Sequence, residues 1–151
     1  MTSSPDRMTP YSHVHAQRVG GWYAVSFLVL GIFVLKLLWG FSWFERSSYY
    51  MIAVYIFLPY AAYRLGRITG LRVLIEGEDA LLQGTACLLS CLLLGALALS
   101  AAGLLHGLIS GESFFLHTTS GREIFSFVAK CLIPIAPLGV LYGASLGLLR
   151  P

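Results

Sequence analysis

The segment from Ala80 to Ile109 runs for 30 residues without one formally charged side chain. A helix needs only about 20 apolar residues to cross a hydrocarbon core about 30 Å thick. The segment can therefore span a membrane, and its extra length requires it to tilt, bend or project. The composition of the whole chain supports this prediction, because 57% of its 151 residues are hydrophobic and only 11% are charged. Soluble domains have about 25% charged residues, so the chain is predicted to be an integral membrane protein.

Apolar stretches at about 22–44, 49–66, 80–109 and 122–149 are separated by short polar connections. Short connections make consecutive spans antiparallel, so we predict an all-α bundle of four transmembrane helices within residues 21–151. Residues 1–20 are polar, lack an apolar period and are predicted to form a flexible cytoplasmic tail. His13 and His15 would bind a metal only on an extended strand with further ligands nearby, and a solvated tail is the simpler interpretation.

Basic residues outside the predicted spans are distributed unevenly. One side would hold Arg7, Arg18, Arg64, Arg67, Arg72 and Arg150, and the other only Arg46 and Arg122. Cytoplasmic loops carry the excess of lysine and arginine. We therefore expect both termini to be cytoplasmic, in a cell membrane that we take to be a bacterial inner membrane.

Three glycines at spacings of four, Gly139, Gly143 and Gly147, form a ridge on the last span. Small residues at this spacing let another helix backbone approach closely, where lipid supplies no hydrophobic drive. The ridge is expected to pack either within the chain or between subunits of an oligomer. Gly103 and Gly107 make the 80–109 segment the expected intrachain partner.

A second, polar face of the last span is predicted around Lys130. At about 100° per residue, Glu123 and Pro137 lie within about 20° of Lys130, and Ser126 and Pro134 within about 40°. Each proline leaves the carbonyl four residues earlier without its helical partner. Such carbonyls need protein, water or an ion inside a bilayer.

Lys36 on the first span and Lys130 on the last are both expected about 10–12 Å inside the outer membrane surface. In one interpretation each ammonium snorkels to the headgroups along its own helix. In the other, both lysines, with Glu123 and Ser126, form a path or site for an anion. The sequence leaves both open.

The connection from Arg64 to Asp79 contains Arg64, Arg67 and Arg72, followed by three acidic residues. It is predicted to be a short hairpin or interfacial segment, which either docks a cytosolic partner or remains a solvated loop that orients the protein.

The sequence lacks the residues that several kinds of functional site require. Cys87, Cys91 and Cys131 lie in apolar runs and are interpreted as small hydrophobes rather than as disulfides or metal ligands. No nucleotide-binding fingerprint occurs, and no clustered basic soluble surface exists to bind nucleic acid. We therefore expect no enzyme, metal or other cofactor.

The sequence favours a non-enzymatic, multi-pass membrane subunit that forms a homo-oligomer in the lipid bilayer. It would act as a scaffold, sensor or pore-like element coupled to a cytosolic partner at the 64–79 loop and the N-terminal tail, as in a defence or secretion system. The alternative is a small channel or carrier for an anionic solute through the intramembrane lysines.

Overall fold

The computed structural model describes residues 12–40, 48–111 and 121–150, without the side chains of residues 110 and 121–128. In these ranges 93% of the residues are helical and no strand occurs. The helical elements are α1 (His13–Trp39), α2 (Ser48–Ile52), η2 (Ala53–Phe57), α3 (Leu58–Leu71), η3 (Arg72–Glu76), α4 (Ala80–Ser110) and α5 (Gly121–Leu148), where η marks a π-helical turn.

Three described helices are long and apolar enough to cross a membrane. They are His13–Trp39, Ala80–Ile109 and Ala129–Leu148, with mean hydropathies of 2.0, 2.3 and 1.8 over their best 18-residue windows. Their length and composition indicate a membrane protein, in agreement with the overall composition.

The first helix begins earlier than the sequence suggested. Residues 13–20 were predicted to belong to a flexible tail, but α1 starts at His13, where the Ser12 hydroxyl accepts a hydrogen bond from the His15 N–H at 3.2 Å. A serine at this position satisfies one of the free N–H groups of the first helical turn. The extended strand needed for metal binding by His13 and His15 is therefore absent. The helix ends at Trp39, and the predicted continuation to residue 44 lies outside the described residues.

The prediction of a loop or hairpin from Arg64 to Asp79 is wrong for most of its length. Elements α2, η2, α3 and η3 follow one another without a gap from Ser48 to Glu76. Gly77 ends this helix with a positive φ of 77°, a conformation that glycine adopts without steric cost. Helix α4 begins three residues later, capped by the Asp79 carboxylate, which accepts from the Leu82 N–H at 2.9 Å.

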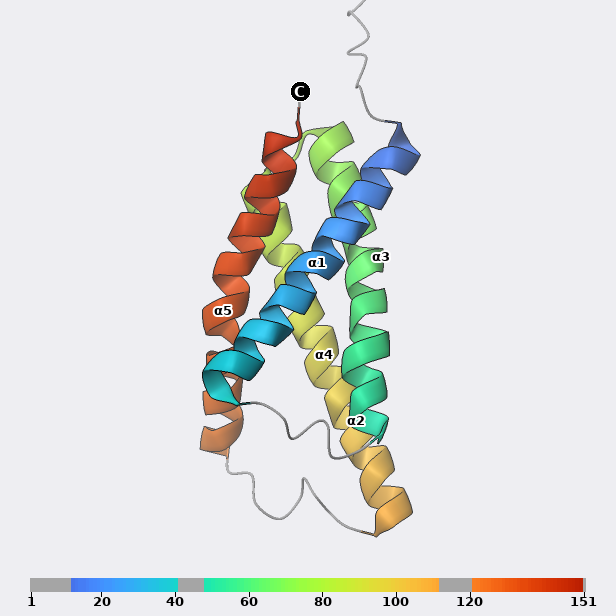
Figure 1. Cartoon of the computed structure of the whole chain (residues 1–151), viewed down its shortest axis with the longest axis vertical. Coiled ribbons are helices and arrows are strands. Elements are labelled where there is room, and N and C mark those ends of the chain that lie inside the picture. The colour runs from blue at the N-terminus through green and yellow to red at the C-terminus, as the bar shows by residue number, and fades with distance from the viewer. Residues whose placement is uncertain (1–11, 41–47, 112–120, 151) are drawn as a thin grey trace, which may run out of the picture.

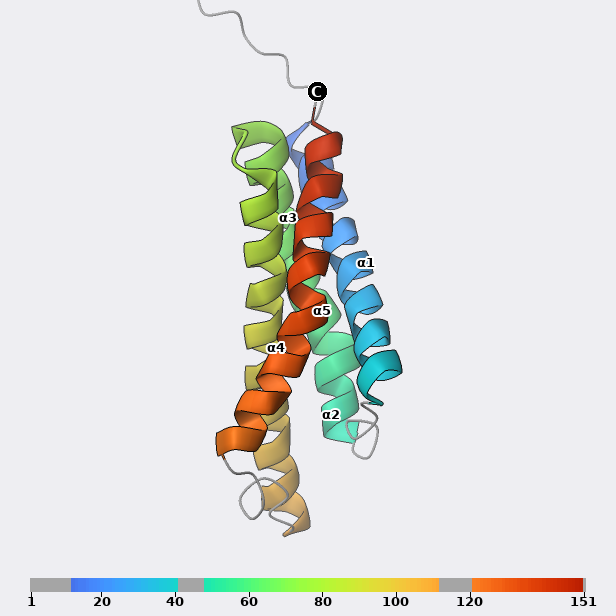
Figure 2. The same ribbon diagram turned by 90° about the vertical axis from the view of Figure 1, so that its left-hand side faces the viewer.

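Figures 1 and 2 show the long helices lying side by side, with the start of α1, the η3–α4 corner and the end of α5 together at one end. We call this the termini end. Helix α1 begins beside α3 and crosses the molecule diagonally in Figure 1. Near its end, the Trp39 ring lies 5.5 Å from the Lys130 ammonium of α5.

Glycines allow two pairs of helices to touch through their backbones near the termini end. Between α1 and α3, a Cβ added to Gly20 would lie 2.7 Å from the backbone nitrogen of Gly70. Between α4 and α5, a Cβ added to Gly139 would lie 2.8 Å from the Cα of Thr85. No side chain fits at either contact, and such close packing is how helices associate where lipid competes for apolar surface.

These contacts predict opposite effects for two alanine substitutions in α1. Gly20→Ala should destabilise the fold by about 1–3 kcal/mol, because its new methyl group overlaps the backbone of α3. Gly31→Ala should be neutral or stabilising, since its nearest neighbour would be Leu138 Cδ1 at 3.4 Å and alanine favours a helix by about 1 kcal/mol over glycine. Unfolding of both variants in mixed detergent micelles would measure the difference, and equal stabilities would contradict the contact.

Candidate functional site

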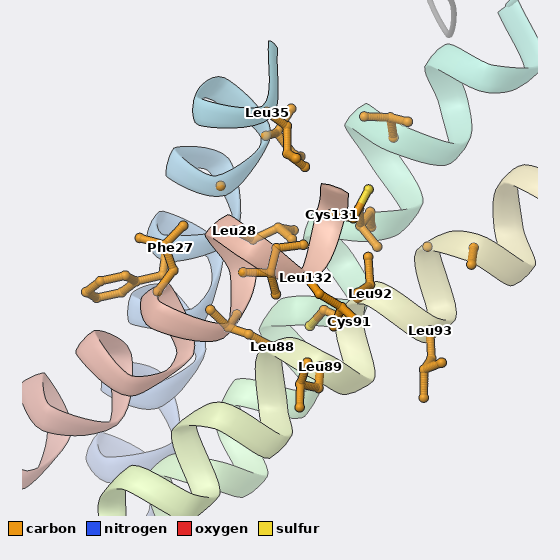
Figure 3. A pocket seen from close by; sticks show the side chains of 18 of the residues that line it. Phe27, Leu28, Leu35, Leu88, Leu89, Cys91, Leu92, Leu93, Cys131 and Leu132 are labelled. Atoms are coloured by element: carbon orange, nitrogen blue, oxygen red, sulfur yellow. The ribbon is translucent and has the colours of Figure 1, made fainter. Parts of the chain in front are cut away.

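A cavity of about 380 Å³ lies in the middle of the molecule, between α1, α4, α5 and the η2–α3 junction (Figure 3). Its lining consists of hydrocarbon and thiol groups. The labelled side chains in Figure 3 are Phe27, Leu28, Leu35, Leu88, Leu89, Cys91, Leu92, Leu93, Cys131 and Leu132. The cavity can therefore hold an apolar group and offers it no charged side chain among the described residues.

Small residues and a π turn help to create this space. Gly31 on α1 and Ala96 on α4 line the cavity where larger side chains would fill it. The π turn η2 contributes Val54 and lies just before Pro59, a residue that cannot donate to the carbonyl four positions earlier. π turns within α-helices often occur at functional positions.

Lys36 and Lys130 both have exposed side chains, and neither lines the cavity. The Lys130 ammonium lies 5.5 Å from the centre of the Trp39 ring, a distance at which the aromatic face attracts a cation. Lys36 belongs to the last turn of α1, where its charge is favoured by the helix dipole. The end of α1 and the first half of α5 thus bring Trp39 and Lys130 together, with Lys36 three residues before Trp39 on the same helix.

This region adjoins the cavity. Leu35 and Cys131, the sequence neighbours of Lys36 and Lys130, both line the cavity. The lysines are therefore on the outer side of the same helix turns that form the cavity wall.

The remaining residues of the predicted polar face are only partly described. Glu123 and Ser126 lie in α5, but their side chains are outside the described ones. Pro137 is exposed, as Lys130 is, whereas Pro134 is buried.

The glycine ridge of α5 lies against the first turns of α4. A Cβ on Gly143 would lie 2.9 Å from the Cα of Leu81, and one on Gly147 would lie 3.3 Å from the Ala80 Cβ. Gly103 and Gly107 lie in the other half of α4, Gly103 buried and Gly107 half-buried. Because α4 and α5 run antiparallel, the ridge at the end of α5 meets the beginning of α4 rather than Gly103 or Gly107.

The three predicted docking arginines lie on α3 and η3 near the termini end. Arg64 and Arg72 are exposed. Arg67 is half-buried and donates a hydrogen bond of 2.6 Å to the Gln17 side-chain oxygen on α1. The three form one helical surface, which we call the arginine surface.

A buried polar cluster, absent from the sequence analysis, joins four elements at the level of the glycine contacts. The Tyr142 hydroxyl donates to the Gly20 carbonyl at 3.0 Å, and the Thr69 hydroxyl donates to the Leu65 carbonyl at 3.2 Å. The buried Cys87 lies beside the side chains of Cys91, Thr69 and Tyr142. Both hydroxyl groups are satisfied inside the protein, as an apolar interior requires.

Two sets of residues were missed for different reasons. The contact of Gly66 and Gly70 with α1 carries a sequence signal, a glycine pair four residues apart, but these residues were assigned to a loop. The cavity residues carry no such signal, because a leucine beside a cavity is the same residue as a leucine facing lipid.

Among the described side chains, no group of three or more histidine, cysteine or acidic residues gathers in a way that could hold a metal ion. Comparisons of the chain with protein-family models, with curated proteins and with solved structures found no match.

The buried cluster makes Tyr142→Phe a direct test of the α1–α5 contact. Loss of the bond to the Gly20 carbonyl should cost about 0.5–1.5 kcal/mol of unfolding free energy. Tyr60→Phe is the matched control, because Tyr60 is 60% exposed whereas Tyr142 is 0% exposed. Thermal unfolding in detergent would compare the two, and equal stabilities would show that the buried bond contributes nothing.

Proposed function

We propose that the protein is a non-enzymatic, multi-pass membrane subunit that forms a homo-oligomer and presents the arginine surface to a cytosolic partner. The observation that carries this proposal is the helical position of Arg64 and Arg72, both exposed. A rigid helix holds charged groups in fixed geometry, as specific docking requires. A solvated loop would not hold these charged groups in a fixed geometry.

In this proposal the chain crosses the bilayer four times. The helix from Ser48 to Glu76 has 29 residues and would extend about 43 Å, more than the hydrocarbon core of about 30 Å. Its first part, residues 48–63, has no charged side chain. It would form the fourth span beside α1, α4 and α5.

The termini end would face the cytoplasm of a bacterial inner membrane. It carries Arg18, Arg150 and the arginine surface, and basic residues are retained on the cytoplasmic side. Glu76, Glu78 and Asp79 lie at the same end, so a partner would meet both signs of charge within a short distance.

Reversing the arginine surface should remove the partner. In the double variant Arg64→Glu, Arg72→Glu, charges that attract the partner become charges that repel it. Recovery of a stoichiometric cytosolic companion should therefore fall about tenfold or more. Native mass spectrometry of the tagged protein, expressed from its own genomic context, would measure the ratio of companion to chain.

Lys36→Glu is the control, because it reverses an exposed cation far from the termini end and should leave the companion bound. The docking proposal fails if wild type carries no stoichiometric companion, or if the double variant retains it.

A shallow apolar groove supports self-association. It has a volume of about 450 Å³ and runs between α2–η2 and α4. Ala53, Ala98, Ala101 and Ala102 line it, and small residues of this kind permit close approach of a second helix in lipid. We assign it to a helix of a second copy.

Enlarging one groove residue should weaken the oligomer. Ala101→Leu should reduce association by about tenfold or more, because the added atoms overlap the incoming helix. Ala86→Leu, at another exposed alanine of α4 outside the groove, should leave the subunit number unchanged. Native mass spectra over a dilution series would measure both, and an unaltered Ala101→Leu oligomer would contradict the groove as the interface.

The apolar lining of the cavity favours a membrane subunit over an anion channel that runs through a single chain. A path for anions needs polar or cationic groups along it. The described cavity lining is apolar instead, and Lys36 and Lys130 lie outside it.

A further inference from the structure

The central cavity has the size and chemistry of a site for one hydrocarbon chain. A dry apolar cavity of about 150 Å³ accommodates benzene, with its six carbons. At the same density, the cavity of about 380 Å³ has room for roughly 15 carbon atoms. A single acyl chain of a membrane lipid has about this size.

A protein helix is a poorer occupant. One helical turn, about 10 Å in diameter and 5.4 Å in rise, fills about 420 Å³. The cavity therefore holds less than one turn. A flexible, narrow chain can enter between α1, α4 and α5 where a helix cannot.

The charge beside the cavity selects among lipids. Lys36 and Lys130 are exposed, and each directly adjoins a residue that lines the cavity, Leu35 and Cys131 respectively. The Trp39 ring, 5.5 Å from the Lys130 ammonium, provides an aromatic surface typical of the headgroup level. Lysines placed this way attract a phosphate and repel no part of an anionic lipid.

We propose that the cavity and its two neighbouring lysines bind one anionic glycerophospholipid. One acyl chain occupies the cavity, and the phosphate lies at Lys36 and Lys130 beside Trp39. This assignment explains why two costly charges occur near an apolar cavity within spanning helices. It does not depend on the oligomer or on the cytosolic partner.

The test uses the full chain in mixed micelles that contain equal amounts of phosphatidylglycerol and phosphatidylcholine with identical acyl chains. Native mass spectrometry then counts the bound lipids of each kind. We expect one tightly held lipid per chain, with phosphatidylglycerol preferred. Lys36→Gln and Lys130→Gln should each reduce that preference about fivefold, whereas Arg18→Gln, at an exposed arginine of the termini end, should not.

A second pair of variants tests the chain-binding part. Ala96→Phe places a ring in the cavity from an exposed lining position and should remove most of the bound lipid of both kinds. Ala86→Phe, on the same helix and outside the cavity, should retain it. Gly31→Leu fills the cavity from α1 and provides an independent check should Ala96→Phe fold poorly.

Each outcome has one meaning. Equal binding of the two lipids to wild type would overturn the assignment of an anionic headgroup. An unchanged lipid count in folded Ala96→Phe and Gly31→Leu would overturn the cavity as the binding site. Loss of the cytosolic companion or of the oligomer would leave both conclusions unaffected.

Discussion

The direct contact of helix backbones at glycines is the interaction on which the rest of this structure depends. Water drives apolar helices together in a soluble protein, but lipid gives no such drive, and close packing must replace it. Gly20 meets Gly66 and Gly70 on one side of the molecule, and Gly84 meets Gly139 and Gly143 on the other. The Tyr142 hydroxyl, bonded to the Gly20 carbonyl, links the two pairs. The helices are thus joined most tightly near the termini end.

The cavity follows from that arrangement. Helix α1 diverges from α3 after the glycine contact (Figure 1), and near its end Trp39 contacts Lys130 of α5. Side chains must fill the space between the diverging helices, and Gly31 and Ala96 are too small to do so. Interiors are normally packed as densely as organic crystals. The cavity of about 380 Å³ lacks such packing and is lined in part by the exposed side chains of Leu93 and Leu132, so a lipid chain that entered it would restore the missing contacts.

The proposals separate by position along the bundle. The arginine surface lies near the termini end, the groove follows α2, η2 and α4, and the lipid site lies beside the end of α1. Buried polar side chains occur in the cluster around Cys87 and also at Tyr50, which is 2% exposed and lies beside His106. This separation suits a subunit that is held in a membrane by lipid and by its own copies while a different surface meets a soluble protein.

The sequence alone predicts the membrane character, the helical class and the glycine ridge of α5, because these depend on local composition and period. It leaves open whether the ridge packs within the chain or between subunits. It placed the boundaries poorly. Residues 13–20 are helical because α1 begins at a serine cap, Ser12. Residues 64–76 are helical because Gly77 is the first described residue after Pro59 with a positive φ. The arrangement of the helices is needed to show that Gly66 and Gly70 contact Gly20, that Lys36 and Lys130 are exposed, and that a cavity exists. Those facts depend on how helices cross, which residues far apart in the chain determine together.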